Sequence, residues 1–148
     1  MARGDSKKVA EYDFQSGLGT YNNSTNTFAW LLVTNTYASL DANTVLNAAS
    51  VTGATIGGNY AGKTSLASVT WSRAGAVSTL DFADITFAAD ASNPIDAKCL
   101  VIMNDTIAGD PLLKIVDLTT DGTTAVDLTQ GFTYTVNAAG SVTVTTNV

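Results

Sequence analysis

The stretch with the most obvious chemical potential is 57–64, GGNYAGKT, which matches the phosphate-loop pattern G-x-x-x-x-G-K-[ST] at every position. In a nucleotide-binding protein a strand leads into this loop and a helix begins at the Lys-Thr pair, so that backbone N–H groups face a phosphate. The next residues, 65–73, read SLASVTWSR, and their apolar residues alternate as in a strand. The sequence therefore predicts a glycine-rich turn between two strands, with Tyr60 packed and Lys63 in solvent.

Other catalytic constellations are missing from the sequence. The chain has no histidine, which excludes Ser-His-Asp and Cys-His nucleophiles and the usual zinc ligand sets. Asp105 and Asp117 each end an apolar run and imitate the magnesium-binding element of a nucleotide site, but a chain with thirteen acidic residues produces such matches by chance. Cys99, the only cysteine, lies in the run CLVIM and is predicted to be a small core residue. We expect a protein without enzymatic activity.

Two pairs of aspartates deserve separate consideration as metal ligands. Asp81 and Asp84 are three residues apart, and Asp90 and Asp96 flank a loop, so either pair could hold a calcium ion. The chain has no D-x-D-x-D loop, which is the stronger calcium signal. We predict solvated turn acids here, with opportunistic calcium as the alternative. No cofactor is expected.

Composition favours strands and turns over helices. The 148 residues are enough for one domain and include 23 Thr, 11 Asn and 12 Gly but a single Glu. Charged residues make up 14 %, against about 25 % in typical soluble domains. This shortage indicates either a surface of Thr, Asn and Ser or a surface covered by other subunits, and we favour the second.

Charge is distributed unevenly along the chain. Residues 1–8 carry Arg3, Lys7 and Lys8 against Asp5, a net of +2, whereas residues 9–148 carry four positive and twelve negative side chains, a net of −8. An acidic body with three basic residues at one end is not a nucleic-acid footprint. We assign residues 1–10 to an N-terminal arm, for which a disordered start is the commoner outcome. The alternative is an extended arm whose cations Arg3, Lys7 and Lys8 contact an acidic neighbouring subunit.

The sequence shows no targeting or membrane signal. Its longest apolar run, FAWLLV at 28–33, has six residues, far fewer than the ~20 that span a membrane, and no apolar stretch follows the first positive charges. With a single cysteine, these features are typical of synthesis and assembly in a bacterial cytoplasm.

Period-two patterns predict eight to ten short strands. The clearest is a β-hairpin whose strands 132–136 and 142–144 flank the turn NAAG. The remaining candidates are 28–33, 69–73, 77–82, 85–87, 99–103, 112–118 and 125–128. We expect the strands from 99 onward to follow one another in an antiparallel meander. Helix is indicated only at 9–18 and at 41–49, where Asp41 or Asn43 could cap the first turn, and neither stretch is long enough to cover a sheet.

These elements predict an all-β fold. We expect an antiparallel β-sandwich of the jelly-roll or immunoglobulin-like kind over residues 11–148, with an extended N-terminal arm and at most one or two short helices.

The order of the segments resembles a group of small virion structural proteins of tailed bacteriophages. The resemblance is carried by six segments: AEYDFQSGLGTY, FAWLLVTNTY, SLDANTV, VTGATIGGNYAGKTSL, LDFADITFAADASNPIDAKCLVIMND and PLLKIVDL. In that group the turn reads Gly-x-Gly-Tyr, two residues, Gly-Gly, one or two residues and Leu. Gly58, Tyr60, Gly62 and Leu66 fit this pattern, but the Gly-Gly pair is reduced to Gly62-Lys63, and this departure creates the phosphate-loop match.

The resemblance implies a β-rich, non-enzymatic component of the virion. We expect a capsid decoration or cement protein that binds the major capsid protein on the outside of the head and self-associates, with a trimer favoured. A tail or head-fibre component remains an alternative. So does a carbohydrate-binding module with stacking platforms on Tyr12, Tyr21, Trp30, Tyr37, Tyr60 and Trp71.

Overall fold

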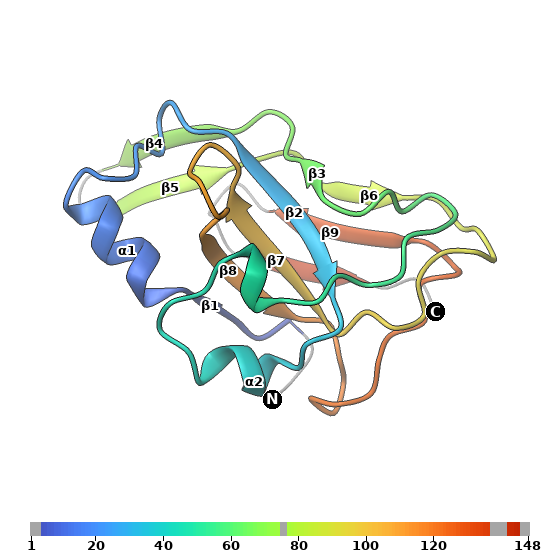
Figure 1. Ribbon diagram of the computed structural model, residues 1–148. Coiled ribbons are helices and arrows are strands. Elements are labelled where there is room, and N and C mark those ends of the chain that lie inside the picture. Colours follow the sequence, from blue (N-terminus) through green and yellow to red (C-terminus); the bar gives the residue numbers. More distant parts are fainter. Residues whose placement is uncertain (1–3, 75–76, 137–141, 146–148) are drawn as a thin grey trace.

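The chain folds into antiparallel sheets with few helices (Figure 1). The computed structural model describes residues 4–74, 77–136 and 142–145. The strands are β1 (Ser6–Lys8), β2 (Phe28–Val33), β3 (Thr64–Ser65), β4 (Thr70–Ala74), β5 (Val77–Asp81), β6 (Ile85–Phe87), β7 (Cys99–Asn104), β8 (Leu112–Asp117), β9 (Phe132–Val136) and β10 (Val142–Thr145). The helices are α1 (Ala10–Gly17), α2 (Tyr37–Asp41) and the 3-10 helix η1 (Ala48–Ser50). The prediction of an all-β chain is confirmed at this level.

Three separate sheets are present in the described residues. A five-stranded sheet has the order β1-β8-β7-β2-β3, a three-stranded sheet the order β10-β9-β6, and β4 pairs with β5 alone. The predicted antiparallel pairings of β7 with β8 and of β9 with β10 are confirmed, and the predicted turn at 137–140 lies outside the described residues. The predicted meander is wrong beyond them, because β8 pairs on its other side with β1, and β9 pairs with β6 in another sheet. Residues 125–128 form no strand and contribute one isolated bridge, Ala97 to Val126.

The five-stranded sheet is built around β7, whose six residues are all buried. A strand that is apolar at every position needs a cover on both faces of its sheet. β2 and β8 flank it, and Val101 pairs with Leu31 on one side and with Ile115 on the other. Alternate residues of β7 therefore enter two different hydrophobic clusters.

One face of this sheet packs against the three-stranded sheet. Leu100, Ile102 and Val116 from the large sheet share a cluster with Ile85, Phe132 and Tyr134 from the small one. Aromatic rings fill much of this space, and Phe82 stacks on Tyr134 with ring centroids 6.4 Å apart.

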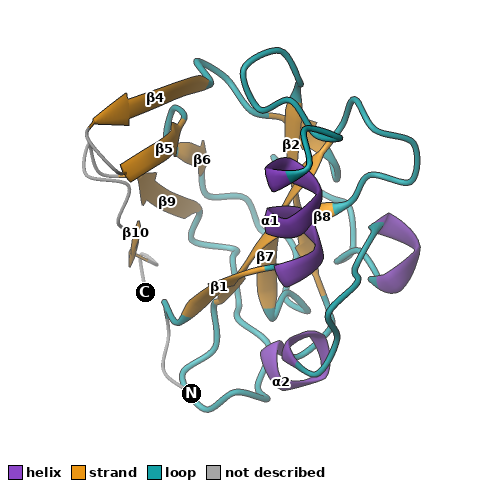
Figure 2. Cartoon of the chain, turned by 90° about the vertical axis from the view of Figure 1, so that its left-hand side faces the viewer, coloured by secondary structure: helices purple, strands orange, loops and turns teal. Residues whose placement is uncertain are grey.

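The opposite face is covered by α1 and α2, so the expectation that the helical segments would cover no sheet is wrong. Tyr12 of α1 and Leu40 of α2 pack with Cys99, Val101 and Met103 of β7. Figure 2 shows both helices on one side of the large sheet and the smaller sheets on the other. The predicted cap of the second helix is also wrong: the Oγ1 atom of Thr36 accepts from the Ser39 N–H, and α2 ends at Asp41.

A recurring turn explains much of the Asp, Asn and Thr content. In an Asx turn the side-chain oxygen of Asp or Asn accepts the backbone N–H two residues later. The described residues contain six such bonds onto a Ser or Thr, from Asn22, Asp90, Asn104, Asp117, Asp121 and Asp127. In two turns the bonds lower a carboxyl pKa: that of Asp121 mainly through the Thr124 hydroxyl and that of Asp127 mainly through the Thr129 N–H. These acids hold turns together.

Two buried tyrosines give a test of this packing. The Tyr134 hydroxyl is buried and has no hydrogen-bond partner among the described residues, whereas the Tyr60 hydroxyl accepts from the Leu32 N–H and donates to the Leu32 carbonyl. We predict that Tyr134→Phe leaves the free energy of unfolding unchanged or raises it by up to about 1 kcal/mol, and that Tyr60→Phe lowers it by about 1–2 kcal/mol. Urea unfolding of both variants measures the difference, and equal losses would contradict the assignment.

Candidate functional site

The residues that match the phosphate loop form a turn against a neighbouring loop. Gly57 and Tyr60 close a tight bridge, and the Asn59 N–H donates to the Asn93 side-chain oxygen. Gly58 has φ +58°, and a Cβ placed on it would lie 2.8 Å from the Asn93 backbone nitrogen. The glycines therefore serve a left-handed turn and a close backbone approach.

The helix that a phosphate loop requires is replaced by a strand. Thr64 and Ser65 form β3, which pairs with Ala29 and Trp30 of β2. No row of N–H groups from a helix start therefore faces Lys63. The predicted turn is present and leads into a strand, β3, but the element before it is the 3-10 helix η1 and not the expected strand. Tyr60 is packed as predicted, with 1 % of its surface exposed.

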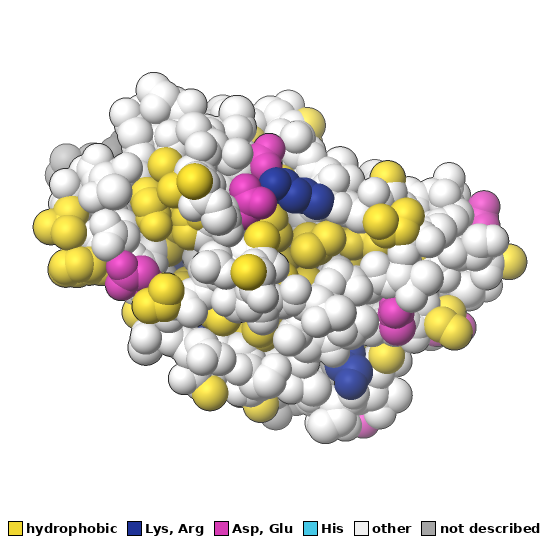
Figure 3. Space-filling view, in the orientation of Figure 1, with side chains coloured by type: hydrophobic (Ala, Val, Ile, Leu, Met, Phe, Trp, Pro, Cys, Tyr) yellow, Lys and Arg dark blue, Asp and Glu magenta, His cyan; other side chains and the backbone are white. Residues whose placement is uncertain are grey.

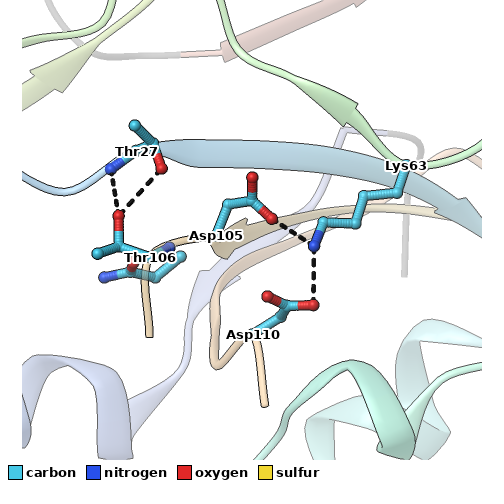
Figure 4. A network of polar contacts seen from close by, with 6 residues as sticks. Thr27, Lys63, Asp105, Thr106 and Asp110 are labelled. Carbon is cyan, nitrogen blue, oxygen red and sulfur yellow. Dashed lines mark hydrogen bonds and ion pairs between the residues drawn. The ribbon is translucent and has the colours of Figure 1, made fainter. Parts of the chain in front are cut away.

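Lys63 is held by two carboxylates, in contrast to the prediction that it lies free in solvent. Its Nζ contacts Oδ1 of Asp105 and lies 2.8 Å from Oδ2 of Asp110 (Figure 4). Hydrogen bonds to these two groups, with Asp105 contributing most, raise the pKa of Lys63. Asp105, which sequence spacing suggested as a magnesium ligand, thus meets Lys63 as its counter-ion.

The same cluster anchors the loop that joins β7 to β8. The Thr27 N–H donates to Oγ1 of Thr106 over 2.8 Å, and the Asp105 N–H donates to the Thr27 carbonyl (Figure 4). The loop is therefore tied to the start of β2 and, through Lys63, to the residues before β3. The arrangement is a clamp between loops.

The other predicted site residues are dispersed. Arg3 lies outside the described residues. Lys7 points to α2, where its Nζ lies 2.7 Å from both Oδ1 and the carbonyl oxygen of Asp41. Lys8 is exposed and lies 3.9 Å from Asp13. Within the segment 1–10 that was predicted to be an arm, residues 6–8 form the edge strand β1 against β8, and Ala10 already begins α1.

The aspartates considered as calcium ligands have separate structural partners. Asp81 accepts from the Phe82 N–H, Asp84 from the Val136 N–H, and Asp96 from the Thr55 N–H and hydroxyl. Within the described ranges no three acidic, cysteine or histidine residues are grouped closely enough to hold a metal ion.

Cys99 is buried in the cluster beneath the helices, which confirms the prediction of a core residue. Burial raises the pKa of its thiol to about 12, with a smaller contribution from the charge of Asp117. The reactive thiolate is therefore disfavoured in the folded state.

The surface residues that remain are mostly apolar or uncharged. Where the structure describes side-chain burial, six large hydrophobic residues are exposed: Phe14, Leu18, Val45, Ile56, Trp71 and Ile95. Phe14 lies on α1, and Leu18, four residues later, is the C-cap of this helix. The Leu18 N–H donates to the Phe14 carbonyl, so the two side chains lie on the same side. Figure 3 shows hydrophobic side chains reaching the surface in several places, with few charged groups between them. Four of the six proposed sugar platforms, Tyr12, Trp30, Tyr37 and Tyr60, are buried.

Comparison with known proteins gives no match, since no family model, curated protein or solved structure is significantly similar to the chain. No helix among the described residues has the length and apolar character to cross a membrane.

The clamp around Lys63 can be tested by removing its charge. We predict that Lys63→Met lowers the free energy of unfolding by about 1 kcal/mol, a value discounted for the partial exposure of the pair, and that 1 M NaCl removes most of this loss. Lys98→Met is the matched control, because it removes the same charge from a lysine without an ion pair among the described residues. The pKa of Lys63 is raised above 10.5, so its contribution is complete below pH 10.5 and is lost only as the pH rises through the raised value. Urea unfolding measures both variants, and equal losses would contradict the clamp.

The thiol of Cys99 gives a second test. We predict that iodoacetamide at pH 8 leaves Cys99 unmodified in the native protein and alkylates it fully in urea, as measured by intact mass. Rapid alkylation without urea would show that the strand is accessible.

Proposed function

We propose that the protein is a non-enzymatic structural subunit of a tailed bacteriophage, namely a decoration or cement protein on the outer surface of the head. The observation that carries the proposal is that its ionisable side chains stabilise the fold, whereas strand edges and apolar side chains are exposed. Ionisable groups of the kind used in catalysis take part in turns and clamps, as for Lys63, Asp96 and Asp121. The surface offers strand edges and single large apolar residues such as Trp71. Such features suit contacts between subunits.

The resemblance to phage structural proteins supports the same conclusion. Its central segment, the glycine turn with Tyr60, is a structural turn in this fold, and Tyr60 hydrogen-bonds to the backbone of β2. A cement protein acts by mass action, because binding to the mature shell and not to its dissociated subunits stabilises the shell. Self-association, with a trimer favoured, is part of the proposal.

We infer further that the small sheets form the second layer of a β-sandwich. Phe82, from the segment between β5 and β6, belongs to the same hydrophobic cluster as Phe132 of β9 and Leu100 of β7. This cluster would be the interior of the sandwich, with the helices added to the outer face of the large sheet. The β4-β5 pair would extend the small sheet beyond β6.

A tail or head-fibre subunit is the main alternative and uses the same surfaces. The carbohydrate-binding alternative has weaker support, because most of its aromatic platforms are buried and Trp71 is the most exposed of the six.

Copy number tests the proposal. We predict that quantitative mass spectrometry of purified particles finds the protein on the order of hundreds of copies per particle, because a shell lattice repeats each contact by symmetry. Separation of heads from tails should leave the protein with the heads. A handful of copies, or recovery with isolated tails, would contradict the head assignment.

A further inference from the structure

The outer edge of β1 is open in the described part of the chain. β1 ends the five-stranded sheet, and no described strand lies beyond it. The Asp117 N–H donates to the Asp5 carbonyl and the Val9 N–H to the Leu113 carbonyl, so positions 5, 7 and 9 face β8. Bonding alternates along an antiparallel pair, and the backbone groups of Ser6 and Lys8 therefore point away from the sheet.

Next to this edge, two lysines lie side by side. Lys8 of β1 is directly opposite Lys114 of β8, which places both on the face of the sheet that also carries Ile102. Lys114 is only partly exposed, and burial, followed by the charge of Lys8, lowers its pKa. Lys114 has no ion-pair partner among the described residues, and Lys8 has only Asp13, at 3.9 Å between two well-exposed side chains.

This pairing is unusual in an acidic chain. Like charges directly opposite on neighbouring strands are destabilising. Lys7 and Lys63, in contrast, each have carboxylates of the same chain at close range. Among the residues that the structure describes, the Lys8-Lys114 pair therefore has no carboxylate as close as those of Lys7 and Lys63 to offset the repulsion.

We propose that the edge of β1 accepts an extended segment of a neighbouring protein chain, and that an acidic side chain of this segment lies beside Lys8 and offsets the charges of Lys8 and Lys114. A strand added to β1 places one residue opposite Lys8, on the face that Lys114 shares. This inference rests on the proposed function for the source of the segment, which is a neighbouring virion subunit.

Charge favours a protein carboxylate over a polyanion. Residues 9–148 have a net charge of −8, which repels nucleic acid, and the two lysines match one or two carboxylates. The partner is therefore a short, extended, acidic protein segment.

Zero-length cross-linking tests the proposal on intact particles. A carbodiimide joins lysines to carboxylates in direct contact, and peptide mass spectrometry then identifies the partners. The expected products join Lys8 or Lys114 to an Asp or Glu of another chain, while Lys7-Asp41 and Lys63-Asp110 products serve as internal positive controls. If the two control cross-links form but neither Lys8 nor Lys114 is cross-linked to another chain, the inference is overturned. A product with a tail protein would support the inference and contradict the head assignment.

A variant pair separates docking from folding. Lys114→Met keeps the aliphatic volume and removes the repulsion, so the free protein should be at least as stable as the wild type in urea. On particles it should dissociate about tenfold faster than Lys98→Met, which loses the same charge elsewhere. Equal dissociation of the two variants would overturn the inference, whether or not the protein decorates heads.

Discussion

The burial of β7 on both faces is the constraint on which the rest of the structure depends. Cys99, Val101 and Met103 face the helices, and Leu100 and Ile102 face the small sheet. Burial of a continuous apolar strand is the main favourable term available to a chain of this size, and it requires two covering layers. The short helices and the small sheets supply these layers. The outer surface is then left with strand edges, turns closed by Asp and Asn side chains, and a few large apolar side chains.

The structural roles of the polar side chains also follow from the burial of β7. Many short strands need many turns, and Asx turns close six of them with side chains that would otherwise be candidates for chemistry. Lys63, Asp105 and Asp110 tie a long loop to the strands beside it. With these residues committed to the fold, we propose that the protein makes its contacts at its margins, at the β1 edge with Lys8 and the partly buried Lys114 beside it.

Local patterns predict most of the strands but not their partners. The alternation at 132–136 and 142–145 and the apolar run at Cys99 are sufficient to place β9, β10 and β7. β1 pairs with β8 over a separation of more than a hundred residues, and no local sequence pattern indicates this pairing. The sequence predicts the second helix at 41–49 because Asp41 resembles an N-cap. In the structure Thr36 caps the helix, and Asp41 is its last residue. The contact of Lys63 with Asp105 and Asp110 is equally invisible in sequence, since it depends on β2 bringing the two loops together.

A cryo-electron microscopy reconstruction of the particle tests the central claim most directly. The account predicts that density for this fold lies on the outer shell of the head, with the β1 edge against an extended segment of an adjacent subunit. A reconstruction in which that edge faces solvent, and subunit contacts are made only by other surfaces, would contradict the account.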